Sequence, residues 1–463
     1  METADSRAKP SGEQHRVIVV GAGIAGLTAA FRLREAGFSV TVLERDQHVG
    51  GRMRTLTHDG FQLDLGAMWL TYHYREMVGL LADAGLRTEM RASSDVIGIV
   101  REGKVHRFRC HRRDDLLRTG LVGRRSKLAA LKLFQDARRA ARLVRFDDMS
   151  DGAALDDRSV EDYCAQRLNR ELTDYLIRPL CSAFYYAPAD ELSVLNAFVA
   201  ARVLIGKRCF NFDSGIDVLP RRLAEQLPVR LGARVTSVEE GPGGVRVHWR
   251  EGTARPRTEE ADACVVAVPA PQVPALVPGL SATQRGYLSQ LRYQPDLGVH
   301  FGLDRPPPVD YLAAFLPPCE NPDLNYLTID HIRAPGRVPE GKGLVSLRFR
   351  PRWSRLHRDR ADHEITAAAL DVLGGSLPDL ARHITAHQVT SLVHHHPLAS
   401  VVRPAGGYRT LRQFTRSLAP RARVQLTGDY LSFSTTNSAL ATGERAAERV
   451  QAALRTSPSP QTT

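Results

Sequence analysis

The feature that most constrains the fold of this chain is a glycine-rich turn between two short apolar runs. The first run spans Arg16 to Val20, and the turn after it has the spacing Gly21-Ala-Gly-Ile-Ala-Gly26. Residues 27–36 have helical periodicity that ends at Gly37, and residues 39–43 form the second apolar run. This order of strand, glycine turn, helix and strand is typical of a βαβ unit that binds a dinucleotide. The sequence therefore predicts an α/β fold built on a Rossmann-like domain.

Each residue type in this unit has a physical role. Gly21 permits the tight turn, Gly23 lets the backbone approach a pyrophosphate, and Gly26 allows the helix to pack against the strands. The helix N-terminus offers N–H donors and a positive dipole end to the phosphates. Glu44, at the end of the second run, can bind both ribose hydroxyls and would repel the 2′-phosphate of NADP. The predicted contacts at this end are Gly21, Gly23, Ile24, Ala25, Gly26, Glu44 and Arg45.

Nucleotide-binding and other segments alternate along the chain, which predicts a discontinuous domain organisation. Nucleotide-binding segments are expected at residues 16–75, 211–275 and 421–455. Between them lie a mostly helical, arginine-rich segment at 76–210 and a strand-rich segment at 276–420. Polar ends that we expect to be disordered span residues 1–15 and 456–463. We therefore expect two lobes, a Rossmann-like domain and an inserted α+β domain that binds the substrate.

Several blocks of the sequence resemble the flavin-containing amine oxidase superfamily. This group includes protoporphyrinogen oxidases, phytoene desaturases, monoamine and polyamine oxidases, and bacterial L-amino acid oxidases. The matching blocks are Val17 to Thr55, Asp64 to Trp69, Ser214 to Ala224, Val265 to Pro269 and Gly428 to Ala446. The segments between them match only weakly. The resemblance implies the two-lobed fold of amine oxidases and protoporphyrinogen oxidases, with FAD as the cofactor.

The resemblance also implies where the cofactor lies. It places the isoalloxazine beside the loop Gly66-Ala67-Met68-Trp69 and the adenine beside Val235. The other implied contacts are Gly51, Arg52, Val268, Gly428, Asp429, Ser438 and Ala439. Asp429 ends a strand, where its carboxylate can accept hydrogen bonds from ribityl hydroxyls. Asn437 or Ser438 can cap the following helix, whose N-terminus would stabilise the negative charge of a reduced flavin.

Two residues that members of this superfamily carry are missing from the chain. No lysine occurs between Gln294 and Asp304, where amine oxidases place one near the flavin N5, and no cysteine occurs between Phe433 and Asn437. We therefore predict non-covalent FAD and a closer likeness to protoporphyrinogen oxidases and desaturases. The expected reaction is hydride transfer from a C–N or C–C bond of a small molecule, with O2 reoxidising the flavin. The alternatives are a non-redox flavin isomerase or mutase, and a flavoprotein that mainly binds a membrane or a partner.

The catalytic side chains are less well defined by the sequence. Trp69 and Tyr72 follow the flavin loop and could line the pocket, and Tyr408 follows a proline–glycine stretch that the family places near the flavin. Packing in the core explains these aromatic residues equally well. The run His394-His395-His396 does not predict a metal site, because strand alternation points His395 away from its neighbours. One of these histidines could still serve as a general base.

Charge is distributed unevenly over the 463 residues. The formal net charge is +12, and basic residues concentrate between Arg101 and Arg145. A solvated basic face explains this segment, and the alternatives are a site for a carboxylated substrate or contact with an anionic membrane surface. No module of interleaved basic and aromatic residues accompanies the charge, so nucleic acid is not an expected partner.

Cellular location is predicted from segments that the sequence lacks. The sequence shows no secretory signal and no apolar stretch that reads as a membrane span, and its six cysteines are scattered without a CxxC pair. We therefore expect a cytoplasmic protein with reduced thiols and no metal centre. The sequence leaves open whether the chain forms a homodimer.

Overall fold

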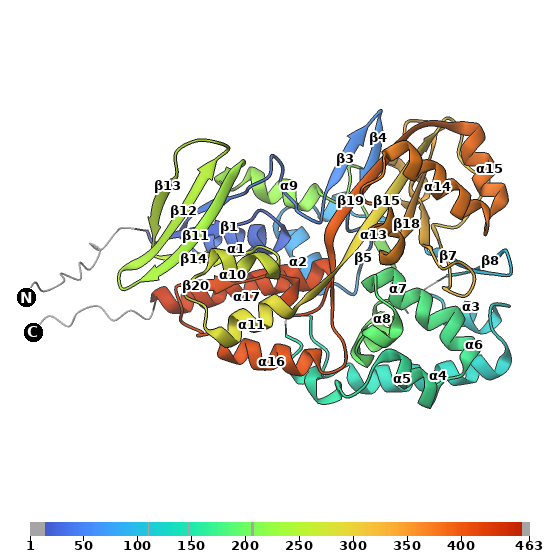
Figure 1. The fold of residues 1–463 in the computed structure, drawn as a ribbon, viewed down its shortest axis with the longest axis horizontal. Coiled ribbons are helices and arrows are strands. Elements are labelled where there is room, and N and C mark those ends of the chain that lie inside the picture. Colours follow the sequence, from blue (N-terminus) through green and yellow to red (C-terminus); the bar gives the residue numbers. More distant parts are fainter. Residues whose placement is uncertain (1–13, 110, 147, 205–207, 456–463) are drawn as a thin grey trace, which may run out of the picture.

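The chain folds into two lobes, and residues of both lobes line one cavity. The computed structural model describes residues 14–109, 111–146, 148–204 and 208–455 (Figure 1). A small parallel sheet and its helices lie on the left of Figure 1, and a larger sheet with flanking helices lies on the right. The long paired strands β15 (Arg292–Leu303) and β19 (Gln388–Val402) run between the lobes. The two-lobed α/β architecture predicted from the sequence is confirmed.

A parallel sheet of five strands forms the centre of the first lobe. In spatial order its strands are β10 (Val229–Arg230), β2 (Ser39–Leu43), β1 (Arg16–Val20), β14 (Ala263–Val266) and β20 (Val424–Leu426). The strands come from the beginning, the middle and the end of the chain, and they all run in the same direction. Because parallel strands bring their carboxyl ends to one edge, the loops that follow β1, β2, β14 and β20 meet there.

Two helices pack closely beside this sheet. They are α1 (Ile24–Glu35), which follows the glycine turn, and α17 (Thr436–Arg455), the last helix. A Cβ placed on Gly443 would lie 2.3 Å from the carbonyl oxygen of Ala25, so only glycine permits this spacing. The remaining elements of the lobe are α9 (Val218–Glu225), α10 (Val273–Leu276), α11 (Ala282–Gln290), β11 (Ala233–Gly241), β12 (Gly244–Glu251) and β13 (Arg257–Ala261). As the sequence predicts, β11 and β12 pair in antiparallel fashion.

A mixed sheet of seven strands forms the centre of the second lobe. In spatial order its strands are β19, β15, β18 (Gly343–Phe349), β17 (Leu324–Ile329), β16 (Ala313–Phe315), β7 (Val96–Arg101) and β8 (Lys104–Arg109). Strand alternation gives this sheet two different faces. Leu297, Val299 and Leu347 belong to a hydrophobic core. The same core includes residues of the helices α13 (Pro351–His357), α14 (Asp362–Gly374) and α15 (Pro378–His387). Asp296, Arg348 and Tyr326 alternate with these residues and form a polar face.

The hairpin β7–β8 is a pair of strands that sequence reasoning did not predict within the segment at 76–210, which is mostly helical as expected. Its two strands pair across Arg101 and Lys104, and they extend the seven-stranded sheet. The turn residues Glu102 and Gly103 have φ values of 52° and 71°. Such a two-residue turn with positive φ is typical of a β-hairpin. The sequence prediction missed it because the strand β7 is short and apolar on both faces, with Ile97 and Ile99 on one face and Val100 on the other, so it shows no clear alternation.

The two segments between the nucleotide-binding segments carry most of the other helices. Those in the predicted helical segment are α2 (Arg75–Asp83), α3 (Arg113–Arg118), α4 (Arg124–Ala140), α5 (Val160–Arg167), α6 (Arg170–Leu172), α7 (Arg178–Tyr185) and α8 (Val194–Leu204). The predicted strand-rich segment at 276–420 also carries helices, namely α11, α12 (Asp330–Arg333), α13, α14, α15 and α16 (Gly407–Ser417). A short hairpin of β3 (Thr55–His58) and β4 (Phe61–Asp64) leads into the loop after Asp64. Of the described residues, no helix is both long enough and apolar enough to cross a bilayer.

One end of the predicted disordered lead-in is ordered. The ring of His15 stacks on Phe38 with centroids 6.2 Å apart, and its Nδ1 lies 3.4 Å from a carboxylate oxygen of Asp262. The expectation of disorder is therefore wrong for His15, because β1 begins directly after it. Residues 1–13 and the predicted tail at 456–463 lie outside the described residues.

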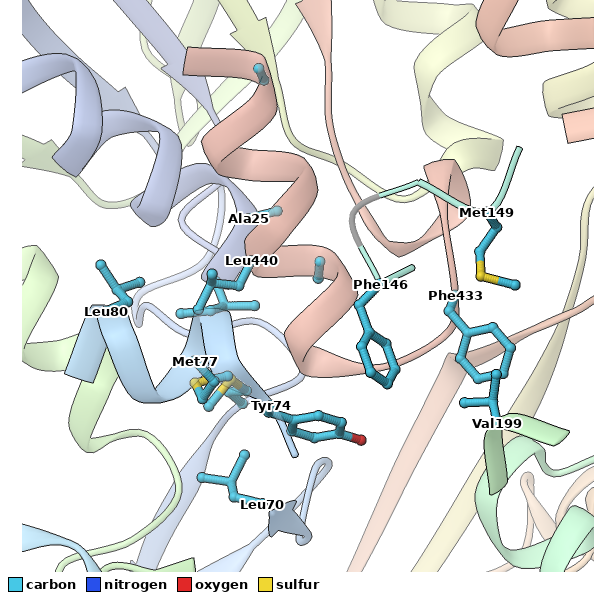
Figure 2. Close-up of a cluster of buried hydrophobic side chains, with 14 of the residues drawn as sticks. Ala25, Leu70, Tyr74, Met77, Leu80, Phe146, Met149, Val199, Phe433 and Leu440 are labelled. Carbon is cyan, nitrogen blue, oxygen red and sulfur yellow. The ribbon is translucent and has the colours of Figure 1, made fainter. Parts of the chain in front are cut away.

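A continuous hydrophobic core links segments that are far apart in the chain. Figure 2 shows Met77 and Tyr74 of the α2 region near Leu440 of α17, with Phe146 beyond them. The Tyr74 and Phe146 rings meet edge to face with centroids 5.6 Å apart. The same core includes residues of α1, α4 and α8. The nucleotide-binding elements and the helical insertion are therefore packed as one unit.

Candidate functional site

A cavity of about 1070 Å³ extends from the carboxyl edge of the parallel sheet to the polar face of the seven-stranded sheet. Small-molecule pockets usually measure about 300–1,000 Å³, so this cavity can hold a large ligand. Its lining combines the turn after β1, the end of β2, the loop after Asp64, part of β15 and β19, and the start of α17. The site therefore depends on segments from the beginning, the middle and the end of the chain.

The glycine turn at one end has the geometry that its sequence predicts. Gly21 has a φ of +101°, and a Cβ on it would lie 2.8 Å from the Ala267 carbonyl oxygen. A Cβ on Gly26 would lie 2.0 Å from the Gly21 carbonyl oxygen. By contrast, a Cβ on Gly23 would meet no atom within 4 Å. The turn is therefore closed on its inner side and open at Gly23, where α1 begins with N–H groups that have no acceptor inside the helix.

Glu44 is fixed beside this turn by two backbone hydrogen bonds. The N–H of Ala22 donates to its Oε2 at 2.6 Å, and the N–H of Asp46 donates to its Oε1 at 2.9 Å. Burial raises the pKa of this carboxyl group, although both hydrogen bonds oppose the shift. Val235 on β11 and Arg45 also line this end of the cavity. A carboxylate held here is suited to bind vicinal hydroxyl groups.

Arg52 and Asp429 form a bidentate ion pair in the middle of the cavity lining. Nη1 and Nη2 of Arg52 each donate to one Asp429 oxygen at 2.7 Å. Burial alone would lower the Arg52 pKa, but the Asp429 charge raises it above its ordinary value. The pair joins the loop after β2 to the segment after β20, two regions that sequence reasoning assigned separately to the cofactor. This bidentate geometry gives the lining a fixed polar centre.

The start of α17 faces the same cavity, but its cap differs from the prediction. The hydroxyl of Thr435 accepts a hydrogen bond from the Ser438 N–H at 3.1 Å, so Thr435 is the N-cap. Asn437 lies within the helix, where its Oδ1 accepts from the Met77 N–H and its Nδ2 donates to Glu76. The prediction that Asn437 or Ser438 caps α17 is therefore wrong. Asn437 instead supplies the capping acceptor for α2.

The loop from Asp64 to Trp69 is held by buried charges. Arg337 donates to Asp64 Oδ1 at 2.7 Å, and an Arg333 nitrogen lies 3.2 Å from Oδ2. Burial would raise the Asp64 pKa, but the two arginines outweigh it and lower the pKa below its ordinary value. A Cβ on Gly66 would lie 2.2 Å from the Arg52 carbonyl oxygen, so the loop runs tightly along the Arg52 backbone.

The far end of the cavity is bounded by the polar sheet face. Asp296 of β15, Tyr326 of β17, Tyr186, and His394 and His396 of β19 line it. The hydroxyls of Tyr186 and Tyr326 lie 2.9 Å apart. Tyr186 follows α7 in the left-handed region with a φ of 54°, which is unusual for a bulky side chain. Strained backbone of this kind often occurs at functional sites.

The three consecutive histidines follow strand alternation as the sequence predicts. His394 and His396 point to the same side, with ring centroids 6.2 Å apart, whereas His395 is exposed. Burial lowers the pKa of His394 to about 3 and that of His396 to about 4, so both rings are neutral near pH 7. Over the part of the chain that the structure describes, no group of three or more potential ligand side chains could hold a metal ion.

The predicted cofactor residues converge on the cavity with two exceptions. Those that line it are Gly21, Gly23, Ile24, Ala25, Glu44, Arg45, Gly51, Arg52, Gly66, Ala67, Met68, Trp69, Val235, Val268, Gly428, Asp429 and Ala439. Gly26 instead packs against Gly21 and Ala267, which is the role that the sequence assigns to it. Ser438 is fully buried and does not line the cavity.

Two of the three catalytic candidates lie away from the cavity. Tyr408 on α16 is 1% exposed, and its hydroxyl donates to Asn196 Oδ1 at 3.3 Å. The ring of Tyr72 packs against Phe210 with centroids 5.0 Å apart. Neither tyrosine lines the cavity, so both predictions are wrong. Trp69 does line it and stacks against Phe315.

The arginine-rich segment is also placed away from the cavity. None of the described residues between Arg101 and Arg145 lines it. Instead, Arg101 pairs with Glu171 at 2.8 Å and Arg109 pairs with Asp115 at 2.9 Å. The interpretation of this segment as a holder of a carboxylated substrate is therefore corrected, because these arginines neutralise nearby surface carboxylates.

Sequence reasoning missed Asp296, Tyr186, Tyr326 and Thr435. For Asp296 a signal was present, because polar Gln294, Asp296 and His300 alternate with apolar residues in a predicted strand. Period-two alternation marks such residues as members of one sheet face. For Tyr186 and Thr435, the sequence gave no comparable pattern.

Comparisons with known proteins agree with this geometry. The family model described as flavin containing amine oxidoreductase matches residues 24–451. The chain is 25% identical over 327 residues to protoporphyrinogen oxidase 2 of Arabidopsis thaliana, a match that covers 60% of this chain and 63% of that protein. It is 29% identical over 259 residues to polyamine oxidase 4 of Oryza sativa subsp. japonica, covering 55% of this chain and 51% of that protein. The matches thus span less than two thirds of these curated relatives.

A solved structure supports the fold assignment. A putative protoporphyrinogen oxidase from Exiguobacterium sp. 255-15 superimposes with a TM-score of 0.75 at 19% identity, covering 95% of this chain and 99% of that chain. The superposition shows that the two proteins share a fold. Because the family model matches residues 24–451, this chain belongs to the family of flavin containing amine oxidoreductases.

Proposed function

We propose that the cavity binds FAD without a covalent bond and that the protein oxidises an organic small molecule by removing hydride from a C–N or C–C bond. The observation that carries this proposal is the continuity of the cavity. Its lining includes both the glycine turn at Gly21 and Gly23 and the polar side chain of Asp296 on the far sheet. An extended dinucleotide would reach from one to the other. The bound flavin supplies the redox chemistry by accepting the hydride.

The described residues fit such a cofactor in order along the cavity. The open position at Gly23 and the start of α1 would hold the pyrophosphate, and Glu44 would bind the adenosine ribose. Arg52 and Asp429 would contact the chain between pyrophosphate and flavin. The N-terminus of α17, capped by Thr435, would stabilise negative charge on the flavin ring.

The lining also supports non-covalent binding. No described cysteine lines the cavity, and the described cysteines are free thiols. Burial raises the pKa of Cys164, Cys181 and Cys264. Buried protonated thiols are poor nucleophiles, so none of these is suited to attach a flavin.

Porphyrinogens and amines are the substrate classes that we propose. The two curated relatives described above are named for protoporphyrinogen and for polyamines. Amines carry a C–H bond on the carbon bonded to nitrogen, and porphyrinogens carry meso C–H bonds next to pyrrole rings that hold an N–H group. The far end of the cavity combines apolar walls from Met68 and Trp69 with the polar floor around Asp296, which suits a large organic molecule with N–H groups. We propose O2 as the electron acceptor.

Anaerobic titration of the purified protein tests the proposal. Protoporphyrinogen IX, coproporphyrinogen III, putrescine and an L-amino acid are added separately, and the flavin absorbance near 450 nm is followed. We expect one class to bleach the flavin and air to restore it with formation of hydrogen peroxide. Turnover under anaerobic conditions without any net colour change would contradict oxidation and support the isomerase alternative.

An exposed helix face supports a second activity, contact with an anionic membrane surface. On α4, Leu128 and Leu131 have exposures of 66% and 49%, and Leu117 on α3 is 57% exposed. Arg124 lies four residues before Leu128, and Arg138 lies seven residues after Leu131, so both arginines are on the same side of α4 as the leucines. Exposed leucines flanked by arginines match an interface with acidic lipids.

Liposome co-sedimentation tests this second candidate. The wild-type protein should bind vesicles that contain phosphatidylserine, and it should bind less at high salt because screening weakens the attraction. The Leu128→Ser/Leu131→Ser variant should bind less, whereas Leu356→Ser on α13 is the control, since Leu356 is also exposed but lies on another helix. Equal binding of neutral and acidic vesicles would contradict the candidate.

A further inference from the structure

Two neighbouring rows of the polar sheet face bring Asp296 together with two neutral histidines and a buried arginine. In the strand register, Asp296 on β15 lies opposite His396 on β19, and Gly298 lies between His394 and Arg348. Gly298 leaves space that the Arg348 guanidinium fills, since a Cβ there would lie 2.3 Å from its Nη1. The absence of a side chain on Gly298 therefore lets a cation lie directly behind the cavity floor.

One of the two carboxylate oxygens of Asp296 is held by Arg348. Arg348 Nη1 donates to its Oδ2 at 2.9 Å, and Nη2 of the same arginine donates to the Asp64 carbonyl oxygen at 2.7 Å. Asp296 is 3% exposed, and its Oδ1 has no hydrogen-bond partner among the described residues. Because Asp296 lines the cavity, this buried oxygen is placed to accept a proton or a hydrogen bond from a ligand.

The groups that face Asp296 differ in their capacity to take up a proton. Arg348 is cationic, and the Tyr186 and Tyr326 hydroxyls stay protonated because burial raises their pKa values. Burial holds the pKa of His394 and His396 far below neutrality. Burial raises the pKa of Asp296, although Arg348 and Tyr186 oppose the shift. Of the described groups compared here, Asp296 is the one whose carboxylate carries a negative charge and has an oxygen, Oδ1, without a hydrogen-bond partner.

We propose that Asp296 is the proton acceptor of the oxidation, with Arg348 as its positioning residue. This inference rests on the proposed function. As hydride leaves the substrate carbon toward a bound flavin, an N–H bond would break and its proton would pass to Asp296 Oδ1. In an amine this N–H is on the nitrogen bonded to that carbon, and in a porphyrinogen it is on a pyrrole ring bonded to the meso carbon. The nitrogen electron pair then forms the C=N bond, so the substrate loses two electrons and two hydrogens. A bound flavin would supply the hydride acceptor, and Asp296 would become a neutral carboxylic acid.

The Asp296→Asn variant tests this role, because it keeps the shape of the side chain and removes the basic oxygen. Asp330→Asn is the matched control, since Asp330 is also fully buried and paired with an arginine, Arg333 at 2.9 Å, but does not line the cavity. Each holoenzyme is mixed anaerobically with the substrate class that bleaches the wild type. The shift of the flavin spectrum before reduction gives the dissociation constant, and the later bleaching gives the reduction rate.

The expected result separates chemistry from binding. General base catalysis contributes about 10²–10⁴-fold to a rate, so the rate of flavin reduction should be lower by that factor in Asp296→Asn. The dissociation constant of the substrate should stay similar to that of the wild type. The wild-type rate should rise with pH through one ionisation that Asp296→Asn lacks. Asp330→Asn should keep that pH profile and most of the wild-type rate, even if its thermal stability is lower.

Three outcomes would count against specific parts of this account. Equal reduction rates and pH profiles in Asp296→Asn and wild type would overturn the proton-acceptor role and leave the proposed function intact. Parallel losses of rate in Asp296→Asn and Asp330→Asn, in proportion to stability, would also overturn it, because they indicate a structural role. A wild-type holoenzyme that no tested substrate reduces would overturn the proposed function itself.

Discussion

Glu44 illustrates how one side chain can determine which nucleotide a fold accepts. Its two carboxylate oxygens are fixed by the N–H groups of Ala22 and Asp46, so the charge lies at a set position beside the turn. The same charge that would attract ribose hydroxyls would repel a 2′-phosphate. Local sequence made this residue predictable, because it follows the second strand at the spacing that a βαβ unit requires.

We predict that Glu44→Ala weakens FAD binding by about tenfold or more, since hydrogen bonds to a charged group contribute about 1.5–3 kcal/mol each. The FAD affinity of Glu44→Gln should lie between that of Glu44→Ala and that of the wild type. The measurement is quenching of FAD fluorescence on titration with apoprotein. Glu225→Ala on α9 is the control, because that side chain is 69% exposed. Undiminished FAD affinity in Glu44→Ala would contradict the nucleotide site.

The two half-buried histidines, His394 and His396, predict an acid-labile fold. Their pKa values are lowered to about 3 and about 4 in the folded protein, whereas an unfolded histidine titrates near 6.5. Between these values the unfolded state binds more protons, so stability falls as the pH falls below about 6.5. The His394→Asn/His396→Asn variant should lose less stability between pH 7 and pH 5, as measured by denaturant unfolding. His395→Asn is the control, because His395 is exposed, and it should lose as much stability between pH 7 and pH 5 as the wild type does.

At the scale of elements, the glycine turn has an inner and an outer side with different requirements. A Cβ on Gly26 would lie 2.0 Å from the Gly21 carbonyl oxygen, whereas a Cβ on Gly23 would meet no protein atom within 4 Å. We predict that Gly26→Ala lowers thermal stability and FAD binding together. Gly23→Ala should keep the stability of the apoprotein and weaken FAD binding, because its methyl group would enter the pyrophosphate space. Thermal unfolding of both apoproteins, followed by FAD titration, measures this difference.

Elements defined by local patterns were predictable from the sequence. The turn at Gly21, the helix after it, α9 with Pro220 in its first turn, and the β11–β12 pair all depend on residues close together in the chain. The polar face of the seven-stranded sheet was not predictable in this way. It requires β7 to join β16 and β15 to pair with β19, and such long-range pairing is not encoded in local periodicity. The prediction that Tyr408 lines the pocket was wrong for a related reason, because the sequence does not distinguish an aromatic residue of the core from one that lines a pocket.

At the scale of the whole molecule, the cavity joins two sheets with separate cores. Trp249 on β12 is fully buried in the core beside the parallel sheet, and Trp353 on α13 is 3% exposed in the core of the larger sheet. A ligand that contacts both lobes should couple their unfolding. We predict that Trp249→Phe and Trp353→Phe holoproteins unfold at the same denaturant concentration when followed by tryptophan fluorescence. Clearly separate midpoints would show that the lobes are not linked by the ligand.

The identity and amount of the cofactor test the central claim most directly. The purified protein is saturated with FAD, freed of excess ligand and precipitated with acid, and the released flavin is identified by mass and quantified by absorbance. The cavity described above predicts one FAD per chain, recovered entirely in the supernatant because no covalent bond holds it. A protein that retains no FAD under these conditions, or a flavin that stays with the precipitate, would contradict the account.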